Sequence, residues 1–219
     1  PEGIRFSSVV MPTPAQVVPD EFRKMGQEIE TEAKKFASVI KPDLICLGCT
    51  TASFIGGPGY DKEIITRIER ASGSPATTTI TCVLELFKDM GIKKIALVGP
   101  YVKSIFDIET KFLEAHGVGS LCVKGLGIVD PSAYYDYYVN PYSVYRLAKA
   151  GAREAPEADC VFISCMWSSI LGIVDVLEEE IGKPVISSCS ATLYGISKKL
   201  GIPDPVYHYG EALTRPRLP

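Results

Sequence analysis

The feature that most constrains the fold of this chain is the regular alternation of short apolar runs with longer amphipathic segments. The short runs are rich in Val, Ile, Leu and Cys, as in DLICLG (43–48), KKIALVG (93–99) and CVFIS (160–164). The segments between them have the length and the apolar spacing of helices. This alternation predicts the α/β class, with parallel sheets covered by helices on both faces.

The alternation predicts seven strands and seven helices. The expected strands are residues 4–10, 43–48, 75–78, 93–99, 120–126, 160–164 and 184–188. The expected helices are residues 20–40, 60–72, 79–91, 103–116, 142–152, 168–181 and 189–200.

The two halves of the chain contain an internal repeat. KPDLICLGCTTAS (41–53) aligns with EADCVFISCMWSS (157–169), and each has an Asp six residues before a Cys that ends a strand. GSPATT (73–78) aligns with GKPVISS (182–188). A repeat of this kind indicates two copies of one βα unit that face each other across a pseudo-twofold axis. Ligands of open parallel sheets bind beyond the carboxyl ends of the strands, so the two repeat cysteines are expected to reach one cleft.

The repeat predicts two lobes, residues 1–90 with residues 190–219, and residues 91–189. The second copy opens with KKIALVGPY before its first helix, whereas the first copy begins directly at PEGIRFSSVV, the counterpart of the second copy's second strand. The sequence also starts without Met. We therefore expect a strand and a helix to precede the first copy in a longer chain.

The bulk composition excludes several functions. A chain of 219 residues that is 46% hydrophobic can bury a proper core. Its net charge is -3 and its Lys and Arg residues form no runs, so we expect no nucleic-acid binding. No apolar stretch approaches the roughly 20 residues of a membrane span, and no charged leader begins the sequence, so we expect a cytoplasmic protein without a membrane partner. The seven cysteines are an odd number in a chain too large to need disulfides, and they are expected to be free thiols.

Cys49 and Cys165, the repeat-matched cysteines, are the candidates for chemistry. Cys49 lies between a strand and a helix expected from about residue 60, and Cys165 lies just before a helix expected from Ser168. A helix N-terminus lowers the pKa of a thiol and also binds anions. The neighbouring hydroxyls that could hold a carboxylate are those of Thr50, Thr51, Ser168 and Ser169. The other five cysteines are expected to be small buried hydrophobes: Cys46, Cys82, Cys122, Cys160 and Cys189.

Other kinds of site have little support. Cys46 and Cys49 form a CxxC pair, but no second ligand pair completes a zinc site, and Cys46 falls inside a strand rather than at the helix start that a redox motif needs. The sequence has only two histidines, His116 and His208, and each is expected to be a surface or packing residue, so a catalytic Ser-His or Cys-His pair is disfavoured. The sequence contains no complete dinucleotide fingerprint and no P-loop. We expect no metal and no cofactor.

Several longer motifs together resemble one superfamily. These are CTTASFIGGPGYDKEIITRIERASGSPATTT, KKIALVGPY, FISC and GKPVISS. They are similar to the aspartate/glutamate/hydantoin racemase superfamily, and within it to the branch of maleate cis-trans isomerases and arylmalonate decarboxylases. The resemblance extends from residue 1 to about 200. It implies two Rossmann-like lobes with the active site between them, one cysteine from each lobe, no cofactor, and a small carboxylate or dicarboxylate substrate.

The resemblance also implies roles for individual residues. Cys49 matches the first-lobe cysteine, and Cys165 matches the second-lobe cysteine that protonates or attacks the substrate. The residues expected to bind the substrate are Thr50 and Thr51, which grip a carboxylate, Tyr101, which bonds a carboxylate or enolate, and Met166 and Trp167, which follow Cys165.

The type of reaction stays open at the level of sequence. A racemase of this kind moves a proton between two thiols, a maleate isomerase adds one thiolate to the double bond, and a decarboxylase protonates an enediolate with the second-lobe cysteine alone. The decarboxylases carry glycine where Cys49 stands here, which favours an isomerase or racemase. Trp167 stands where a small polar residue is expected, and it either fills the pocket or packs in a core or interface. A non-catalytic protein that binds a small carboxylate is the remaining alternative, although it would not need two thiols.

YYDYYVNPYSVY (134–145) gathers six tyrosines around a proline. Such a cluster can form a lid, a subunit contact or a loop packed on its own helix. The subunit contact is favoured slightly, and it predicts a possible homo-oligomer.

Overall fold

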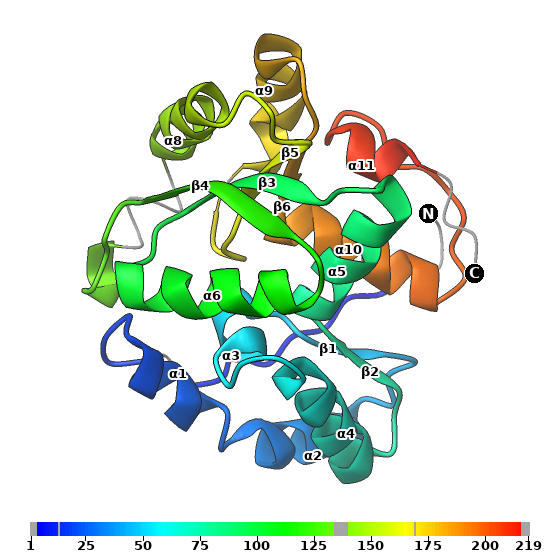
Figure 1. The fold of residues 1–219 in the computed structure, drawn as a ribbon. Helices are drawn as coiled ribbons and strands as arrows, with labels where there is room; N and C mark the ends of the chain where they lie inside the picture. The colour runs from blue at the N-terminus through cyan, green and yellow to red at the C-terminus, as the bar shows by residue number, and fades with distance from the viewer. Residues whose placement is uncertain (1–3, 13, 134–139, 169, 216–219) are drawn as a thin grey trace.

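The structure is a computed structural model that describes residues 4–12, 14–133, 140–168 and 170–215 (Figure 1). Its strands form two parallel sheets. The smaller sheet pairs β1 (Ile45–Leu47) with β2 (Ala76–Thr78). The larger sheet has the order β4-β3-β5-β6 and consists of β3 (Lys94–Gly99), β4 (Gly119–Gly125), β5 (Cys160–Ile163) and β6 (Val185–Ser187). The predicted α/β class with parallel sheets is confirmed.

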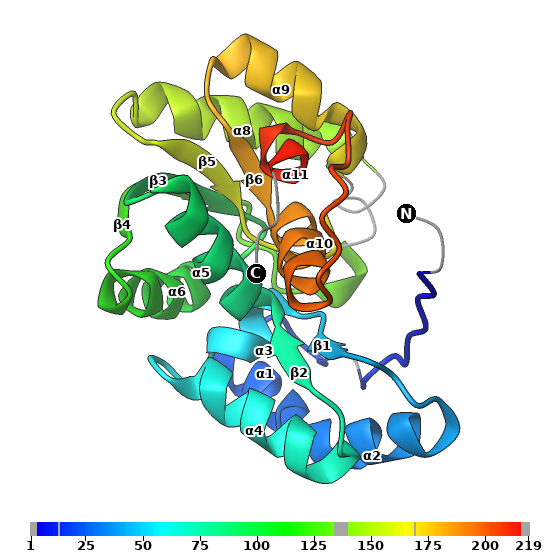
Figure 2. The same cartoon turned by 90° about the vertical axis from the view of Figure 1, so that its right-hand side faces the viewer.

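Helices surround both sheets. Those that precede the larger sheet are α1 (Pro19–Met25), α2 (Ile29–Val39), α3 (Thr50–Phe54), α4 (Tyr60–Ser72) and α5 (Thr79–Met90). Those that follow β3 are α6 (Lys103–Ala115), α8 (Pro141–Glu154), α9 (Val174–Ile181), α10 (Ser188–Lys199) and α11 (Glu211–Thr214). Figure 2 shows α1 to α4 around the smaller sheet in one half of the molecule, and the larger sheet between α6 on one side and α8 and α9 on the other.

The internal repeat is visible in the strand register. The last paired residues of the two repeat units are Leu47 with Thr78 and Ile163 with Ser187. Cys49 and Cys165 each follow two residues later, at the carboxyl end of β1 and of β5. In each unit the residue that ends the second strand also caps the next helix, since its side-chain oxygen accepts a backbone N–H. Equivalent local structure therefore presents both thiols in the same way.

Helices α5 and α10 follow equivalent strands and pack against each other, which joins the two halves. The contact is close because α10 carries Gly195, where a methyl group would lie 2.5 Å from Cys82 Sγ on α5. Thr192 of α10 donates a buried hydrogen bond to Thr79 of α5 (3.2 Å). The division of the chain into residues 1–90 with 190–219 and residues 91–189 stays a prediction.

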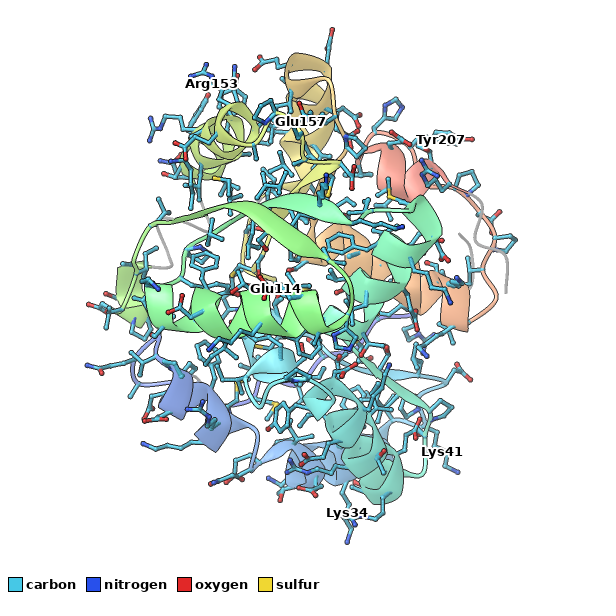
Figure 3. The ribbon with its side chains drawn as sticks, viewed as in Figure 1. Lys34, Lys41, Glu114, Arg153, Glu157 and Tyr207 are labelled. Atoms are coloured by element: carbon cyan, nitrogen blue, oxygen red, sulfur yellow. The ribbon has the colours of Figure 1, made fainter. Side chains whose placement is uncertain are left out.

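One apolar core runs through both halves. Phe54 of α3 lies 6.3 Å from Phe112 of α6 between ring centroids, and Phe87 of α5 meets Phe162 of β5 edge-on at 5.3 Å. Most charged side chains lie outside this core, among them those labelled in Figure 3 on Lys34, Lys41, Glu114, Arg153 and Glu157, whereas Asp61 and Glu109 are fully buried. In the described ranges, no helix is both long enough and apolar enough to cross a membrane.

The strand expected at residues 4–10 is absent. These residues have no regular secondary structure, and Phe6 is 69% exposed. A strand needs a neighbour whose backbone groups it can pair with, and neither β1 nor β2 pairs with this segment.

The helix expected over residues 20–40 is broken at Gly26 into α1 and α2. The carbonyl of Gly26 accepts a hydrogen bond from Arg67 (2.8 Å) instead of continuing the helix. Its missing side chain also leaves room for the Tyr60 hydroxyl, which would lie 2.5 Å from a methyl group at this position. The helix expected from residue 168 begins only at Val174, after a 3₁₀ turn over Leu171–Ile173.

The tyrosine-rich segment lies partly outside the described residues, at 134–139. Of the two tyrosines that the structure describes, Tyr142 is exposed. Tyr145 of α8 donates a hydrogen bond to Glu180 of α9, which also accepts one from Lys149 (2.6 Å). Tyr145 therefore ties two helices of its own chain together, and the homo-oligomer stays a prediction.

Candidate active site

A cavity of about 1300 Å³ is lined by the segments that follow β1, β3, β5 and β6. It extends over residues 4–11 and along α2. All seven predicted site residues line it: Cys49, Thr50, Thr51, Tyr101, Cys165, Met166 and Trp167. The structure thus brings Cys49 and Cys165 to one cavity, as the repeat predicted, and places the other five candidates beside them.

Cys49 is the N-cap residue of α3, a helix that sequence reasoning missed. The nearby backbone N–H groups of Thr51 and Ala52 act to lower its pKa, which is the expected effect of a helix N-terminus. Burial has the opposite and larger effect, and it raises the pKa of Cys49 to about 11. The prediction of a lowered thiol pKa is therefore wrong for Cys49, because desolvation outweighs the two N–H groups.

Cys165 is also held in its neutral form, since burial raises its pKa to about 12. The backbone N–H of Trp167 donates to Cys165 Sγ (3.3 Å), and a hydrogen bond with the Tyr101 side chain also lowers the pKa. Cys49 and Cys189 lie near enough to raise it further by charge repulsion. Among the described residues after Cys165, the next α-helix begins only at Val174, so no helix N-terminus lies at this thiol and the pKa prediction is wrong for Cys165 too.

Ser188, the first residue of α10, connects the two cysteine segments. Its Oγ accepts a hydrogen bond from the backbone N–H of Cys165 (3.1 Å) and another from Thr50 Oγ1 (2.9 Å). All three residues are buried. One hydroxyl thus fixes the position of Cys165 relative to the segment that carries Cys49.

The hydroxyl groups expected to hold a carboxylate are not equivalent. Thr50 donates to Ser188, and Ser168 donates to the carbonyl of Cys165 (3.0 Å), so both have partners within the protein. Thr51 Oγ1 is buried and has no hydrogen-bond partner among the described residues. Since a buried hydroxyl is normally paired, Thr51 is a donor available to a ligand. Ser169 lies outside the described residues.

The aromatic residues of the site occupy different depths. Tyr101 is buried and packs edge-on against Phe106 at 5.6 Å. Trp167 is 49% exposed, so it lies at the rim of the cavity and neither fills its interior nor packs in the core. The carbonyl of Met166 accepts a hydrogen bond from the Cys189 thiol (3.1 Å), which holds the Met166 backbone against the start of α10.

Sequence reasoning missed several residues near the site. Cys46 and Cys189, which were expected to be unrelated to it, both line the cavity. Ser188 could have been found from the repeat, since it matches Thr79 at the start of the equivalent helix. Glu109 is fully buried on the apolar face of α6 beside Ser164, the residue before Cys165. Its signal was a charged residue in the helical spacing of four apolar ones, at 105, 106, 112 and 113.

All seven cysteines are free thiols. In the part of the chain that the structure describes, no three His, Cys, Asp or Glu side chains gather as metal ligands would. The independence from metals and cofactors stays a prediction.

Comparisons with known proteins agree with this architecture. The family model of arylmalonate decarboxylase matches residues 2–213, almost the whole chain. Maleate isomerase from Geobacillus stearothermophilus is 23% identical over 204 residues, which cover 90% of this chain and 79% of that protein. Arylmalonate decarboxylase from Bordetella bronchiseptica is 25% identical over 158 residues, which cover 72% of this chain and 65% of that protein.

The solved structures with the same fold include a variant of the Nocardia farcinica maleate cis-trans isomerase with a covalently bound succinylcysteine intermediate. It superposes with a TM-score of 0.86 at 24% identity, over 97% of this chain and 88% of that one. This likeness confirms the two-lobed fold, and the extent of the family match settles the relationship. The chain belongs to the arylmalonate decarboxylase family.

Proposed function

We propose that this chain is a cofactor-independent isomerase of a small, maleate-like dicarboxylate and that Cys49 and Cys165 carry the reaction. The observation behind the proposal is that two thiols from equivalent positions of a repeat line one cavity. Relatives named maleate isomerase support the choice of reaction. So does the succinylcysteine intermediate of the Nocardia farcinica isomerase, which is the product of adding a thiol to maleate.

The site offers several donors for a dicarboxylate. The Thr51 hydroxyl has no partner among the described residues and sits in the first turn of α3. The Tyr101 side chain lies beside Cys165. With one donor group near each thiol, the two carboxylates can be held at the two ends of the cavity and the double bond can lie between the sulfurs.

In the proposed reaction, Cys49 first gives its proton to water, and the resulting thiolate forms a carbon–sulfur bond with one alkene carbon. The electron pair of the double bond moves to the other carbon, where the adjacent carboxylate delocalises it, and the Cys165 thiol gives that carbon a proton. The central bond is now single and rotates. The Cys165 thiolate then removes a proton from the same carbon, the double bond re-forms in the trans arrangement, and the Cys49 thiolate leaves.

A decarboxylase is the second candidate, because the family model that matches the chain is that of arylmalonate decarboxylase. This reaction needs only Cys165, which would protonate the enediolate left after loss of carbon dioxide. The Tyr101 side chain beside Cys165 could stabilise that enediolate. Cys49 has no role in this alternative, so its removal separates the two reactions.

Proton NMR in deuterium oxide tests the proposal. The protein, Cys49→Ala and Cys165→Ala are each incubated with maleate, aspartate, hydantoins and 2-aryl malonates. Conversion of maleate to fumarate that both substitutions abolish supports the isomerase. Carbon dioxide release from an aryl malonate that survives Cys49→Ala would replace it with the decarboxylase. Deuterium exchange at the α-carbon of aspartate or a hydantoin would indicate a racemase, and binding without turnover would indicate a binding protein.

A further inference from the structure

Glu109 is a buried carboxyl group that the proposed reaction does not use. It lies in the middle of the apolar face of α6, among Ile105, Phe106, Phe112 and Leu113, and its exposed fraction is 0%. Its Oε1 lies 2.5 Å from Ser164 Oγ, and its Oε2 has no hydrogen-bond partner among the described residues. A buried carboxyl group destabilises the fold unless hydrogen bonds or an opposite charge offset the cost of removing it from water, so we expect Glu109 to have a function.

Ser164, the partner of Glu109, directly precedes Cys165, and its backbone contacts two neighbouring residues of β3. Its backbone N–H donates to the carbonyl of Val98 on β3 (2.8 Å). Its carbonyl oxygen lies against Gly99, where a methyl group would come within 2.6 Å of it. The Glu109 hydrogen bond is the contact that holds its side chain. A shift of Ser164 would move the Cys165 peptide, whose N–H donates a hydrogen bond to Ser188 Oγ (3.1 Å).

Among the described residues, no charged group compensates the burial of Glu109. The elements packed most closely against α6 are β4 and α3. The titratable groups on or beside these elements and next to Ser164 are Cys49, Tyr101, Cys122, Lys124, Cys160 and Cys165, and none of them shifts the pKa of this carboxyl. Burial raises the pKa of Glu109 to about 8, and the Ser164 hydrogen bond opposes this only in part. The group is thus neutral at pH 7 and ionises just above it.

We propose that Glu109 is a positioning residue that fixes Cys165 in the cavity by holding Ser164. The inference rests on the proposed role of Cys165 and deepens it. In its neutral form Glu109 accepts one hydrogen bond from the Ser164 hydroxyl in an apolar setting. Once ionised, the carboxylate is a buried charge with a single hydrogen-bond donor, which is costly in an apolar setting and loosens the packing around Ser164. Cys165 then loses its alignment with the Trp167 N–H and the Tyr101 side chain, the two groups that favour its thiolate.

The test combines turnover with a readout that does not depend on the substrate. Glu109→Gln keeps an acceptor for Ser164 but cannot ionise, whereas Glu109→Leu and Ser164→Ala remove the bond. Glu114→Gln is the matched control, since Glu114 lies on the same helix but is exposed (Figure 3). Iodoacetamide labelling is followed at each cysteine by mass spectrometry from pH 6.5 to 9.5, and the rate at Cys165 is divided by that at Cys122 on β4.

In the unchanged protein and in Glu114→Gln, we expect this ratio to fall threefold or more as pH rises through about 8, the pKa of Glu109. In Glu109→Gln it should stay constant, and turnover should keep rising above pH 8 where that of the unchanged protein declines. Glu109→Leu and Ser164→Ala should lower kcat about tenfold or more at pH 7 with KM within twofold. The same pH profile of the ratio in the unchanged protein and Glu109→Gln would overturn the proposal. Because labelling needs no substrate, this result is distinct from a failure of the isomerase assignment.

Discussion

At the scale of single residues, the site combines two thiols that burial keeps protonated. The raised pKa of Cys49, about 11, and of Cys165, about 12, means that neither is a thiolate in the resting protein at neutral pH. At pH 7 roughly one Cys49 side chain in ten thousand is ionised. Protonated Cys165 suits its proposed role as a proton donor, while Cys49 must first lose its proton.

The state of Cys49 predicts the pH dependence of its reactivity. The rate of iodoacetamide labelling at Cys49 should rise about tenfold per pH unit from pH 7 and reach no plateau below about pH 10, because the thiolate fraction grows until the pKa is passed. Peptide mapping by mass spectrometry measures this rate. A plateau near pH 8 would show that the helix N-terminus, and not burial, sets the pKa of Cys49.

Glu109 predicts a pH dependence of stability. Its folded pKa is raised from 4.5 to about 8, so its contribution is fully present below about pH 4.5 and is lost as pH rises through 8. The free energy of unfolding should therefore fall by several kcal/mol between pH 5 and 9, and this slope should be much smaller in Glu109→Gln. Urea unfolding at both pH values measures it, with Glu114→Gln as the control. An unchanged slope in Glu109→Gln would show that other groups cause the loss.

The two thiols could be predicted because repetition in the sequence marked them, whereas their environment could not. The Asp-to-Cys spacing alone placed Cys49 and Cys165 at equivalent strand ends. Their pKa values depend on how much water the surrounding chain excludes, and no local pattern encodes that. Ser188 and Glu109 act through contacts with residues 138 and 55 positions away, which only the folded chain brings together.

At the scale of elements, six of the seven strands expected from the alternation of apolar runs with helices are present in the structure. The failures have local physical causes: Gly26 breaks the long helix where Arg67 binds its carbonyl, and residues 4–10 lack a strand to pair with. Helix α3 was not predicted because it is only five residues long and lies in a stretch that ends in Gly and Pro, which is typical of a loop. Short helices of this kind depend on tertiary contacts rather than on their own sequence pattern.

The contact of α5 with α10 predicts the effect of one substitution. Ala in a helix is normally more stable than Gly by about 0.5–1 kcal/mol. At Gly195, however, the added methyl group would lie 2.6 Å from Cys82 Cβ and 3.1 Å from its Cα, so Gly195→Ala should destabilise the protein by about 1–3 kcal/mol. Gly172→Ala, where a methyl group meets nothing within 4 Å, is the control. Equal urea midpoints for the two variants would show that the helices can separate without cost.

At the scale of the whole molecule, the two halves meet where the chemistry is proposed. Helices α5 and α10 join them, and Ser188 binds Thr50 from one half and Cys165 from the other. A dicarboxylate in the cavity would contact both halves. Its binding should therefore stabilise the fold as a unit.

The Thr51 hydroxyl, which has no partner within the described part of the chain, allows this linkage to be tested. Maleate should raise the melting temperature of the unchanged protein, and Thr51→Val should weaken binding about tenfold or more, since a hydrogen bond to a charged group contributes about 1.5–3 kcal/mol. Thr66→Val is the control, because the Thr66 hydroxyl is exposed on α4 and bonds the carbonyl of Lys62. A thermal shift of equal size in Thr51→Val would exclude this hydroxyl from carboxylate binding.

The most direct test of the central claim is the detection of the covalent intermediate. Cys165→Ala is incubated with maleate, quenched with acid and digested, and the cysteine peptides are examined by mass spectrometry. If Cys49 attacks maleate and Cys165 transfers the proton, the peptide that contains Cys49 should gain the mass of one maleic acid. The double variant Cys49→Ala/Cys165→Ala should form no such adduct. Fumarate formation by the Cys49→Ala variant, or an adduct confined to another cysteine, would contradict the account.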